Sequence, residues 1–220
     1  MILESGVSMK KLSPTLLSIV LIASTLGAMS TASASVEPTV DLATAANFQI
    51  LAGSALTLGA SVTGTKPDSD GISSSAVEDL SAAIAAVSEF PGVTGTADLG
   101  GLTYGPGVYL SPAGAAFAMT GDVVLDAKDN SDAIFIFYTP AAMDTTASIT
   151  ISLINGAQAK NVYWVAGGAI TTGASDILVG TFMSNAAITT GASDTITGSL
   201  LGGAAVTVGA SNNFVDPIVS

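Results

Sequence analysis

Hydrophobic and polar positions alternate over several short runs of the chain, and this two-residue period is typical of β-strands. Four of these runs are also rich in β-branched and aromatic residues, which favour extended structure. They cover residues 122–127, 133–139, 148–154 and 161–167, and turn-forming segments such as KDNSD and NGAQAK separate them. The pattern therefore predicts a mainly β protein.

One segment has the longer period of a helix. Within SAVEDLSAAIAAVSEFPG, apolar residues recur at spacings of three and four, which places them on one helix face. These residues are Val77, Leu80, Ile84 and Val87. Ser75, with Glu78 three residues later, forms a capping-box pattern, and Pro91 and Gly92 follow the apolar stripe. We therefore expect one helix over about residues 75–90.

Near the C-terminus, an eight-residue pattern returns at a constant interval of 18 residues. AITTGASD begins at Ala169 and again at Ala187, and AVTVGASN begins at Ala205. A related stretch, ALTLGAS, begins at Ala55, and a shorter echo, TTAS, begins at Thr145. Short repeats made of strands are typical of solenoids. Three strands of five or six residues per coil, at ~3.3 Å per residue, predict a triangle with sides under ~20 Å.

Equivalent residues of successive coils form columns, because stacked strands lie ~4.7–4.9 Å apart. One predicted inward column consists of Ile170, Ile188 and Val206. A second, at a tight corner, consists of Ala174, Ala192 and Ala210. The predicted outward columns are Thr171, Thr189 and Thr207, and Ser175, Ser193 and Ser211. The side taken by Thr172, Thr190 and Val208 depends on a local turn geometry that the pattern leaves open.

The open ends of a solenoid expose unpaired strand edges. Residues 35–48 and the C-terminal FVDPIVS are candidates to cover them, and Pro217 suits a terminated edge because it lacks an N–H donor. The predicted helix would run along the side of the coils, so it cannot serve as an end cap.

The first residues have the features of an export signal. Lys10 and Lys11 precede an apolar run from Leu16 to Leu26, and Ala32-Ser33-Ala34 then offers a small-x-small cleavage pattern. We expect residues 1–34 to be a secretory signal peptide and residues 35–220 to be a single extracellular domain. No later segment has eighteen consecutive apolar residues, so no membrane interaction is expected.

Composition excludes several kinds of chemistry. The sequence has no histidine and no cysteine, so Ser-His-Asp and Cys-His catalysis and zinc sites with nitrogen or sulfur ligands are ruled out. Five lysines face seventeen carboxylates, which gives a formal net charge of −12. The basic footprint that nucleic acid or anionic lipid requires is therefore missing. We expect no cofactor, no nucleic acid partner and a monomer.

The acidic residues leave two further alternatives open. Solenoid enzymes that act on polysaccharides use Asp clusters, although most acids here fall in predicted turns, where solvation explains them. The column of Asp176, Asp194 and Asn212 fits a solvated corner or, as a second interpretation, a Ca²⁺ site. Calcium β-rolls, however, use glycine-rich nonapeptides, and neither that period nor the double glycine is present.

Five segments together resemble the secreted microbial ice-binding proteins. They are VDLATAANFQILAGS (40–54), LGGLTYGPGVY (99–109), LDAKDNSDAIFIF (125–137), LINGAQAKNVYWVAG (153–167) and GTFMSNAAITTGA (180–192). The resemblance covers nearly all of residues 35–220. It implies a discontinuous right-handed β-solenoid of triangular cross-section with one long α-helix packed alongside. It also implies that the N-terminal strands complete the sheet beside the C-terminal coils.

The resemblance further implies adsorption to ice through one flat solenoid face, with inhibition of ice growth or recrystallisation. The family's loose motif is Thr, then Ala or Gly, then any residue, then Thr or Asn. The segments 172–175 and 190–193 match its first three places but carry serine in the fourth, and 208–211 also loses the first threonine. Only KPDSDGISSS connects Thr65 to the helix, so the cap-like insertion of many members is reduced or absent.

The candidate ice-binding residues offer hydroxyl and methyl groups at a repeating interval. They are Thr171, Thr172, Ser175, Thr189, Thr190, Ser193, Thr207 and Ser211. The expected partner is the surface of an ice crystal. The alternative function is that of an extracellular structural or adhesive solenoid module, since Thr and Ser ladders also stabilise sheet surfaces by cross-strand contacts.

Overall fold

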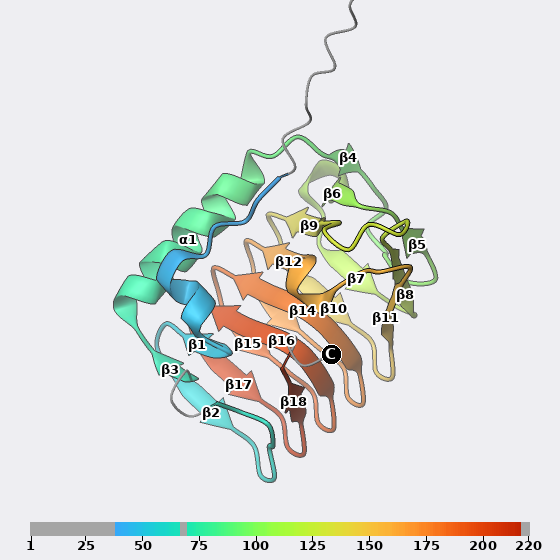
Figure 1. The fold of residues 1–220 in the computed structure, drawn as a ribbon. Coiled ribbons are helices and arrows are strands. Elements are labelled where there is room, and N and C mark those ends of the chain that lie inside the picture. The colour runs from blue at the N-terminus through green and yellow to red at the C-terminus, as the bar shows by residue number, and fades with distance from the viewer. Residues whose placement is uncertain (1–37, 67–69, 217–220) are drawn as a thin grey trace, which may run out of the picture. The chain divides into compact units, whose positions relative to one another are not determined.

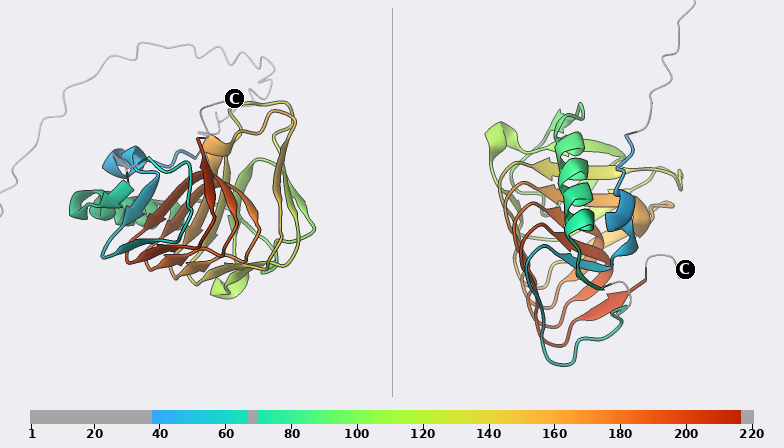
Figure 2. Two further views of the ribbon diagram at one scale, coloured as in Figure 1. Left: turned by 90° about the horizontal axis from the view of Figure 1, so that it is seen from below. Right: turned by 90° about the vertical axis from the view of Figure 1, so that its left-hand side faces the viewer.

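The computed structural model describes residues 38–66 and 70–216, which form three parallel sheets around a triangular interior (Figure 1, Figure 2). Sheet A has the order β3 (Asp70–Ile72), β1 (Ile50–Ala52), β16 (Thr195–Gly202), β14 (Ile177–Ser184), β12 (Val162–Ala166), β9 (Phe135–Thr139), β6 (Gly107–Leu110), β4 (Val93–Thr94). In addition, β18 (Asn213–Val215) pairs with the first half of β16.

The other two sheets form the remaining sides of the triangle. Sheet B has the order β2 (Leu56–Leu58), β17 (Val206–Val208), β15 (Ile188–Thr189), β13 (Ile170–Thr171), β10 (Met143–Thr145), β7 (Phe117–Met119). Sheet C consists of β11 (Ile151–Ile154), β8 (Val123–Asp126) and β5 (Thr103–Tyr104). The four strands predicted between residues 122 and 167 are confirmed as β8, β9, β11 and β12.

The repeats stack directly over one another. Ile170 pairs with Ile188, which pairs with Val206, and the threonines that follow them pair in the same register. The class predicted from the repeat and the resemblance, a mainly β solenoid of triangular section with one helix alongside, is therefore confirmed.

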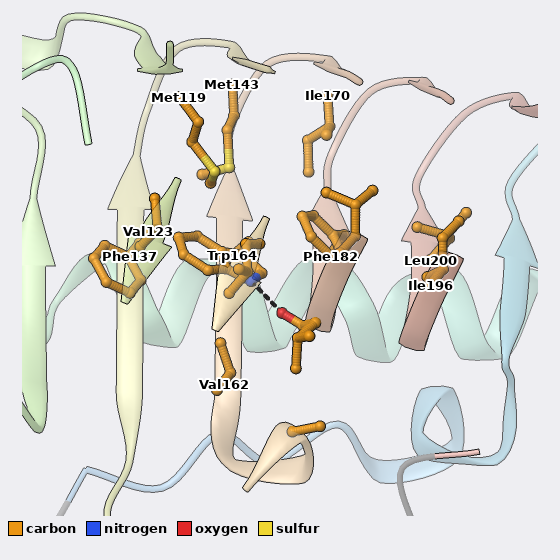
Figure 3. Packing of buried hydrophobic residues seen from close by; sticks show 14 of the residues in the cluster. Met119, Val123, Phe137, Met143, Val162, Trp164, Ile170, Phe182, Ile196 and Leu200 are labelled. Carbon is orange, nitrogen blue, oxygen red and sulfur yellow. Dashed lines mark hydrogen bonds between the residues drawn. The ribbon is translucent and has the colours of Figure 1, made fainter. Parts of the chain in front are cut away.

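The interior is filled by apolar side chains from all three sheets (Figure 3). On sheet A, Phe137, Trp164 and Phe182 stack in successive coils, with ring centroids 4.4 Å and 6.0 Å apart. The predicted inward residues Ile170, Ile188 and Val206 are buried opposite them. Trp164 Nε1 donates to the Val179 carbonyl at 2.8 Å, so the indole N–H is satisfied inside the core.

A single long helix, α1 (Ser74–Ser88), lies along the outside of sheet A (Figure 1). Its buried face is Ala76, Leu80, Ala83, Ile84 and Val87. This face packs against a second apolar cluster on the sheet that includes Leu51, Val165, Met183 and Leu201. The helix begins earlier than predicted: its N-cap is Ser73, not Ser75, and the Ser73 hydroxyl accepts from Ala76 N at 3.4 Å.

The segments expected to cover the solenoid ends pack elsewhere or extend a sheet. The chain from residue 38, including the short helix η1 (Ala43–Asn47), lies beside α1 (Figure 1), so the prediction that residues 35–48 cap an end is wrong for the residues described. Residues 213–215 extend the wall as β18. Pro217 and the predicted signal peptide, residues 1–34, lie outside the described residues.

The solenoid is discontinuous, as the resemblance implies. β1 pairs with β16 and β2 pairs with β17, so the N-terminal coil lies against the last C-terminal coil. The fifteen residues of α1, about 22 Å at the usual rise per residue, then carry the chain toward the opposite end, where β4 begins the run of coils that returns. Within the described residues, no helix has the length and apolar character needed to cross a membrane.

Candidate functional site

The outer faces of the three sheets differ in what covers them. On sheet A, α1 and the segment around η1 bury a large apolar area. On the side formed by sheet C and the first half of β14, the short helix η3 (Ala159–Asn161) packs against β14, and Ile177 is half-exposed beside it. Sheet B carries its exposed side chains in straight columns, so its outer face is the candidate functional surface.

A column of four exposed threonines runs across this face. Thr57, Thr207, Thr189 and Thr171 pair in register through β2, β17, β15 and β13. The outward orientation predicted for the last three is confirmed by their exposure. Thr57 was not among the predicted site residues, although the similarity of ALTLGAS to the C-terminal repeats was a signal that pointed to it.

The placement of Thr172 and Thr190 on an exposed face is wrong. Thr172 and Thr190 are only 6% and 4% exposed. Side chains alternate along a strand, so Thr172 points inward like Ile170, two positions before it. Thr190 Oγ1 accepts from Gly209 N at 3.1 Å and from Asn212 Nδ2 at 2.7 Å. These threonines therefore hold successive coils together and are not available to a ligand on the surface.

The column of Asp176, Asp194 and Asn212 lies beneath the face and is fully buried, which corrects the expectation of a solvated corner. Asp194 Oδ1 accepts from the Asp176 N–H at 2.9 Å, and Asp194 Oδ2 accepts from Thr172 Oγ1 at 3.0 Å. Asn212 repeats the first contact with the Asp194 N–H at 2.8 Å. Each side chain thus satisfies a backbone donor and pairs with a threonine of the preceding coil.

Within this buried ladder, Asp194 has a shifted pKa. Burial raises the pKa of its carboxyl above the ordinary value of 3.8, and the negative charge of Asp176 acts in the same direction. Hydrogen bonds from the Asp176 N–H and the Thr172 hydroxyl oppose the rise. Among the described residues, no three His, Cys, Asp or Glu side chains are grouped so that they could hold a metal ion.

Below the threonines, the chain turns a corner through serines in the left-handed backbone region. Ser61, Ser175, Ser193 and Ser211 have φ between 60° and 65°. At such a residue the alternation of a strand is broken, so the preceding alanine and the serine both face outward. The prediction that Ala174, Ala192 and Ala210 point inward is therefore wrong, whereas that of exposed Ser175, Ser193 and Ser211 is confirmed.

The close contact between coils falls on the glycines of the repeat instead of the alanines. A Cβ atom placed on Gly191 would lie 2.0 Å from the Gly173 carbonyl oxygen, and one on Gly209 would lie equally close to the Gly191 oxygen. Only glycine lets the backbones approach this far. The stacked glycines keep the neighbouring rows of threonine, alanine and serine at the strand spacing.

These columns define what we call the threonine face. It consists of the exposed residues Thr57, Ala60, Ser61, Thr171, Ala174, Ser175, Thr189, Ala192, Ser193, Thr207, Ala210 and Ser211. Four coils each contribute one threonine, one alanine and one serine, and none of the twelve side chains carries a charge. The arrangement offers a regular lattice of hydroxyl and methyl groups with no residue suited to bond-making chemistry.

Away from this face, Asp126 has structural partners. Asp126 Oδ2 accepts from Lys128 Nζ at 2.5 Å and Asp126 Oδ1 from Asn155 Nδ2 at 2.8 Å; the hydrogen bond from Lys128 is the main cause that lowers the Asp126 pKa to about 2. A groove of about 320 Å³ between α1 and the N-terminal segment is lined mainly by alanine, valine and phenylalanine. Two carboxylates, Asp41 and Asp79, also line it, and both accept hydrogen bonds from the N-terminal segment: Asp41 Oδ1 from Ala43 N at 3.0 Å and Asp79 Oδ2 from Thr44 N at 3.1 Å.

The fold and this surface define a class: β-solenoids with one lateral helix that present a flat, uncharged array of hydroxyl-bearing side chains. The sequence model of a family described as Ice-binding-like matches residues 15–213. The chain therefore belongs to the Ice-binding-like family, which is non-enzymatic.

Known proteins of this family resemble the chain over different lengths. It is 30% identical over 168 residues to the ice-binding protein of Nostoc sp. (strain HG1), a match that covers 65% of this chain and 61% of that protein. It is 39% identical over 79 residues to ice-binding protein 1 of Shewanella frigidimarina, 36% of this chain and 9% of that protein. The matches thus span less than two thirds of these relatives.

Solved structures share the fold over most of its length. The ice-binding protein of the Antarctic ascomycete Antarctomyces psychrotrophicus is 30% identical, with a TM-score of 0.70, and the match covers 80% of this chain and 97% of that one. The ice-binding protein LeIBP of an Arctic yeast has a TM-score of 0.72 at 17% identity, covering 84% and 96%. The latter likeness concerns the fold alone.

Proposed function

We propose that this protein adsorbs to ice through the threonine face and thereby inhibits ice growth or recrystallisation. The observation that carries the proposal is the register of four exposed threonines, with an alanine and a serine in each row, on the outer face of sheet B. Family membership supports it, as does the fact that the relatives described above are ice-binding proteins.

The chemistry of threonine suits an ordered layer of water. Its hydroxyl can donate and accept a hydrogen bond, while its methyl group occupies a gap between water molecules. Because threonine is branched at Cβ, few rotamers are open to it on a strand, so little side-chain entropy is lost on adsorption. A charged side chain would instead hold a hydration shell of its own.

The buried ladder beneath the face keeps the rows in place. Thr172 and Thr190 bond to Asp194 and Asn212 of the following coils, so each coil is tied to the next by side chains as well as by the sheet. The stacked glycines allow the close approach that this bonding needs. Rigidity of the face is important because a surface that is already ordered loses little conformational entropy when it binds the crystal.

A lysine substitution on two different sheets tests the proposal. Thr189→Lys places a charge in the middle of the face and should reduce the gap between melting and freezing temperatures by on the order of ten-fold. Thr103→Lys puts the same side chain on an exposed threonine of sheet C and should leave the gap unchanged. Both residues are exposed, so both variants should unfold at the same temperature as the wild-type protein.

The competing function is a structural or adhesive surface module. On that reading, crystals grown in a solution of the folded wild-type protein would have ordinary shapes and no freezing gap. Shaped crystals whose habit reverts in Thr189→Lys but persists in Thr103→Lys would favour ice binding. Equal effects of the two substitutions would overturn the assignment of the threonine face.

We also propose that the protein acts outside the cell as a monomer, after removal of residues 1–34. The pattern of Lys10 and Lys11, an apolar run and Ala32-Ser33-Ala34 supports export. N-terminal sequencing of protein recovered from culture medium should give Ser35 as the first residue. Sedimentation of that material should give the mass of one chain, and an intact N-terminus or a dimer mass would contradict the respective parts.

A further inference from the structure

The threonine column ends before sheet B does. β10 continues sheet B one coil beyond β13, and the residue that pairs with Thr171 there is Asp144. One coil further, in β7, the paired residue is Ala118. Asp144 therefore occupies the fifth position of a column whose first four positions are threonines.

The serine corner of this fifth row matches that of the other four. Ala147 and Ser148 are exposed, and Ser148 has φ 65°, the same left-handed conformation as the serines of the face. Ser148 N donates to the Ala174 carbonyl at 2.9 Å, just as Ser175 N donates to Ala192 and Ser193 N to Ala210. The backbone platform thus extends over five coils. The side chains of the fifth row depart from the pattern at Thr146, an uncharged residue in the place of the repeat glycine, and at Asp144, which carries a charge.

The charge of Asp144 is not neutralised by the protein. Asp144 is exposed, and within the described ranges no hydrogen bond or ion pair of its carboxylate is found. It lies one strand spacing, ~4.8 Å, from the Thr171 backbone. A solvated carboxylate orients the water around it, which disturbs the uncharged lattice at the adjoining row.

We propose that Asp144 sets the edge of the ice-contacting surface and limits it to four coils. The carboxylate excludes the fifth row, although Ala147 and Ser148 are already placed to take part. This inference rests on the proposed function, because it concerns the extent of the same surface. It makes the activity of the natural protein lower than its backbone allows.

The test is a gain of activity. Asp144→Thr should complete a fifth row and raise the freezing gap about two-fold at equal concentration, and Asp144→Asn, which removes only the charge, should give part of that rise. Asp132→Asn is the matched control, because Asp132 is exposed and its substitution changes the net charge equally away from the face. Asp132→Asn should leave the freezing gap at the wild-type value.

The outcomes separate this inference from the proposed function. If Thr189→Lys abolishes the freezing gap while both Asp144 variants stay at the wild-type value, the edge role is wrong and ice binding through the face stands. If Thr189→Lys has no effect, the face itself is misassigned. An equal rise in Asp132→Asn would mean that net charge is responsible, and it would overturn the role of Asp144. Thermal unfolding temperatures close to that of the wild-type protein confirm that the variants are folded.

Discussion

Asn212 and Thr190 meet between two coils of the solenoid, where Asn212 Nδ2 donates to Thr190 Oγ1 at 2.7 Å. The same amide also donates to the Gly191 carbonyl at 3.0 Å, and its oxygen accepts from the Asp194 N–H. This contact lies directly beneath the threonine face. Two adjacent threonines of one repeat therefore have different roles: Thr189 faces solvent, and Thr190 is buried and links successive coils by hydrogen bonds.

The first prediction separates these roles. Thr190→Val leaves the Gly209 N–H and the Asn212 amide without their shared acceptor, so the free energy of unfolding should fall by about 1–3 kcal/mol. Thr189→Val, one residue away on the exposed side, should change it by less than about 0.5 kcal/mol. Denaturant unfolding of the two variants measures both values, and equal losses would contradict the orientation described here.

The chain suggests a rescue for the first variant. Where the last C-terminal coil meets the N-terminal coil, the equivalents of Thr190 and Asn212 are Val208 and Val62, so two apolar residues replace the polar pair. Thr190→Val combined with Asn212→Val should therefore cost less than the sum of the two single changes, because neither partner is left unpaired. A strictly additive loss would show that the pair is not coupled.

The second prediction concerns pH. Because burial raises the folded-state pKa of Asp194, the ionised carboxylate weakens the fold: its contribution to stability is most favourable below the ordinary pKa of 3.8 and is lost as pH rises through the raised folded value. Asp194→Asn should be more stable than wild type at pH 7, and the difference should shrink towards pH 4. Asn212 already places an amide at the equivalent site of the next coil.

Unfolding curves of Asp194→Asn and wild type at the two pH values provide the measurement. Asp144→Asn is the control, since it removes an exposed carboxylate and should not reproduce the pH-dependent difference. A gap between Asp194→Asn and wild type that is the same at pH 4 and pH 7 would rule out titration of Asp194 as the cause.

The third prediction tests the glycine stack. Gly191→Ala would bring a Cβ atom to 2.0 Å from the Gly173 oxygen, so the coils would have to separate and the loss should be about 3 kcal/mol or more. Gly95→Ala is the matched change, because a Cβ there meets nothing within 4 Å. Thermal unfolding should show a large fall for the first variant and almost none for the second.

The fourth prediction sets stability against activity at the serine corner. Ser193 has φ 65°, a conformation that costs a residue with a Cβ about 1–2 kcal/mol and that glycine adopts freely. Ser193→Gly should therefore raise the free energy of unfolding by about 1 kcal/mol while reducing the freezing gap, because one hydroxyl of the face is lost. In contrast, Ser199→Gly, within the extended strand β16, should lower stability. A stabilised variant with undiminished activity would remove Ser193 from the site.

Much of the fold could be predicted because the repeat makes each coil a copy of the next. Ile170 and Thr171 show the two-residue alternation of a buried and an exposed position, and the 18-residue interval then carries it to the other coils. The helix was predictable from its apolar stripe, but its start was not, since three consecutive serines at 73–75 all suit an N-cap. In the structure the N-cap is Ser73, whose hydroxyl accepts from Ala76 N.

The candidate site was less predictable where the backbone leaves the strand. Nothing in the letters Gly-Ala-Ser indicates a left-handed serine, because that conformation is usually taken by glycine or asparagine. Because of this turn, Ala174 faces outward and Asp176 points inward. Asp176 Oδ2 accepts a hydrogen bond from Thr145 Oγ1 at 2.5 Å. Asp144 escaped notice for a different reason: it lies outside the 18-residue repeat, and only the pairing of β10 with β13 places it in the threonine column.

The discontinuous path of the chain has a consequence for biosynthesis. Thr63 and Asn213 meet by a side-chain hydrogen bond although 150 positions separate them along the chain. β2, and the edge of β1 that pairs with β16, must therefore wait for their partner strands until the last coils have been translated, and such distant pairings slow folding. The row that Thr57 adds to the surface is completed only in this final step, so a nascent chain halted before β17 would lack a quarter of its threonine rows as well as its partner for β2.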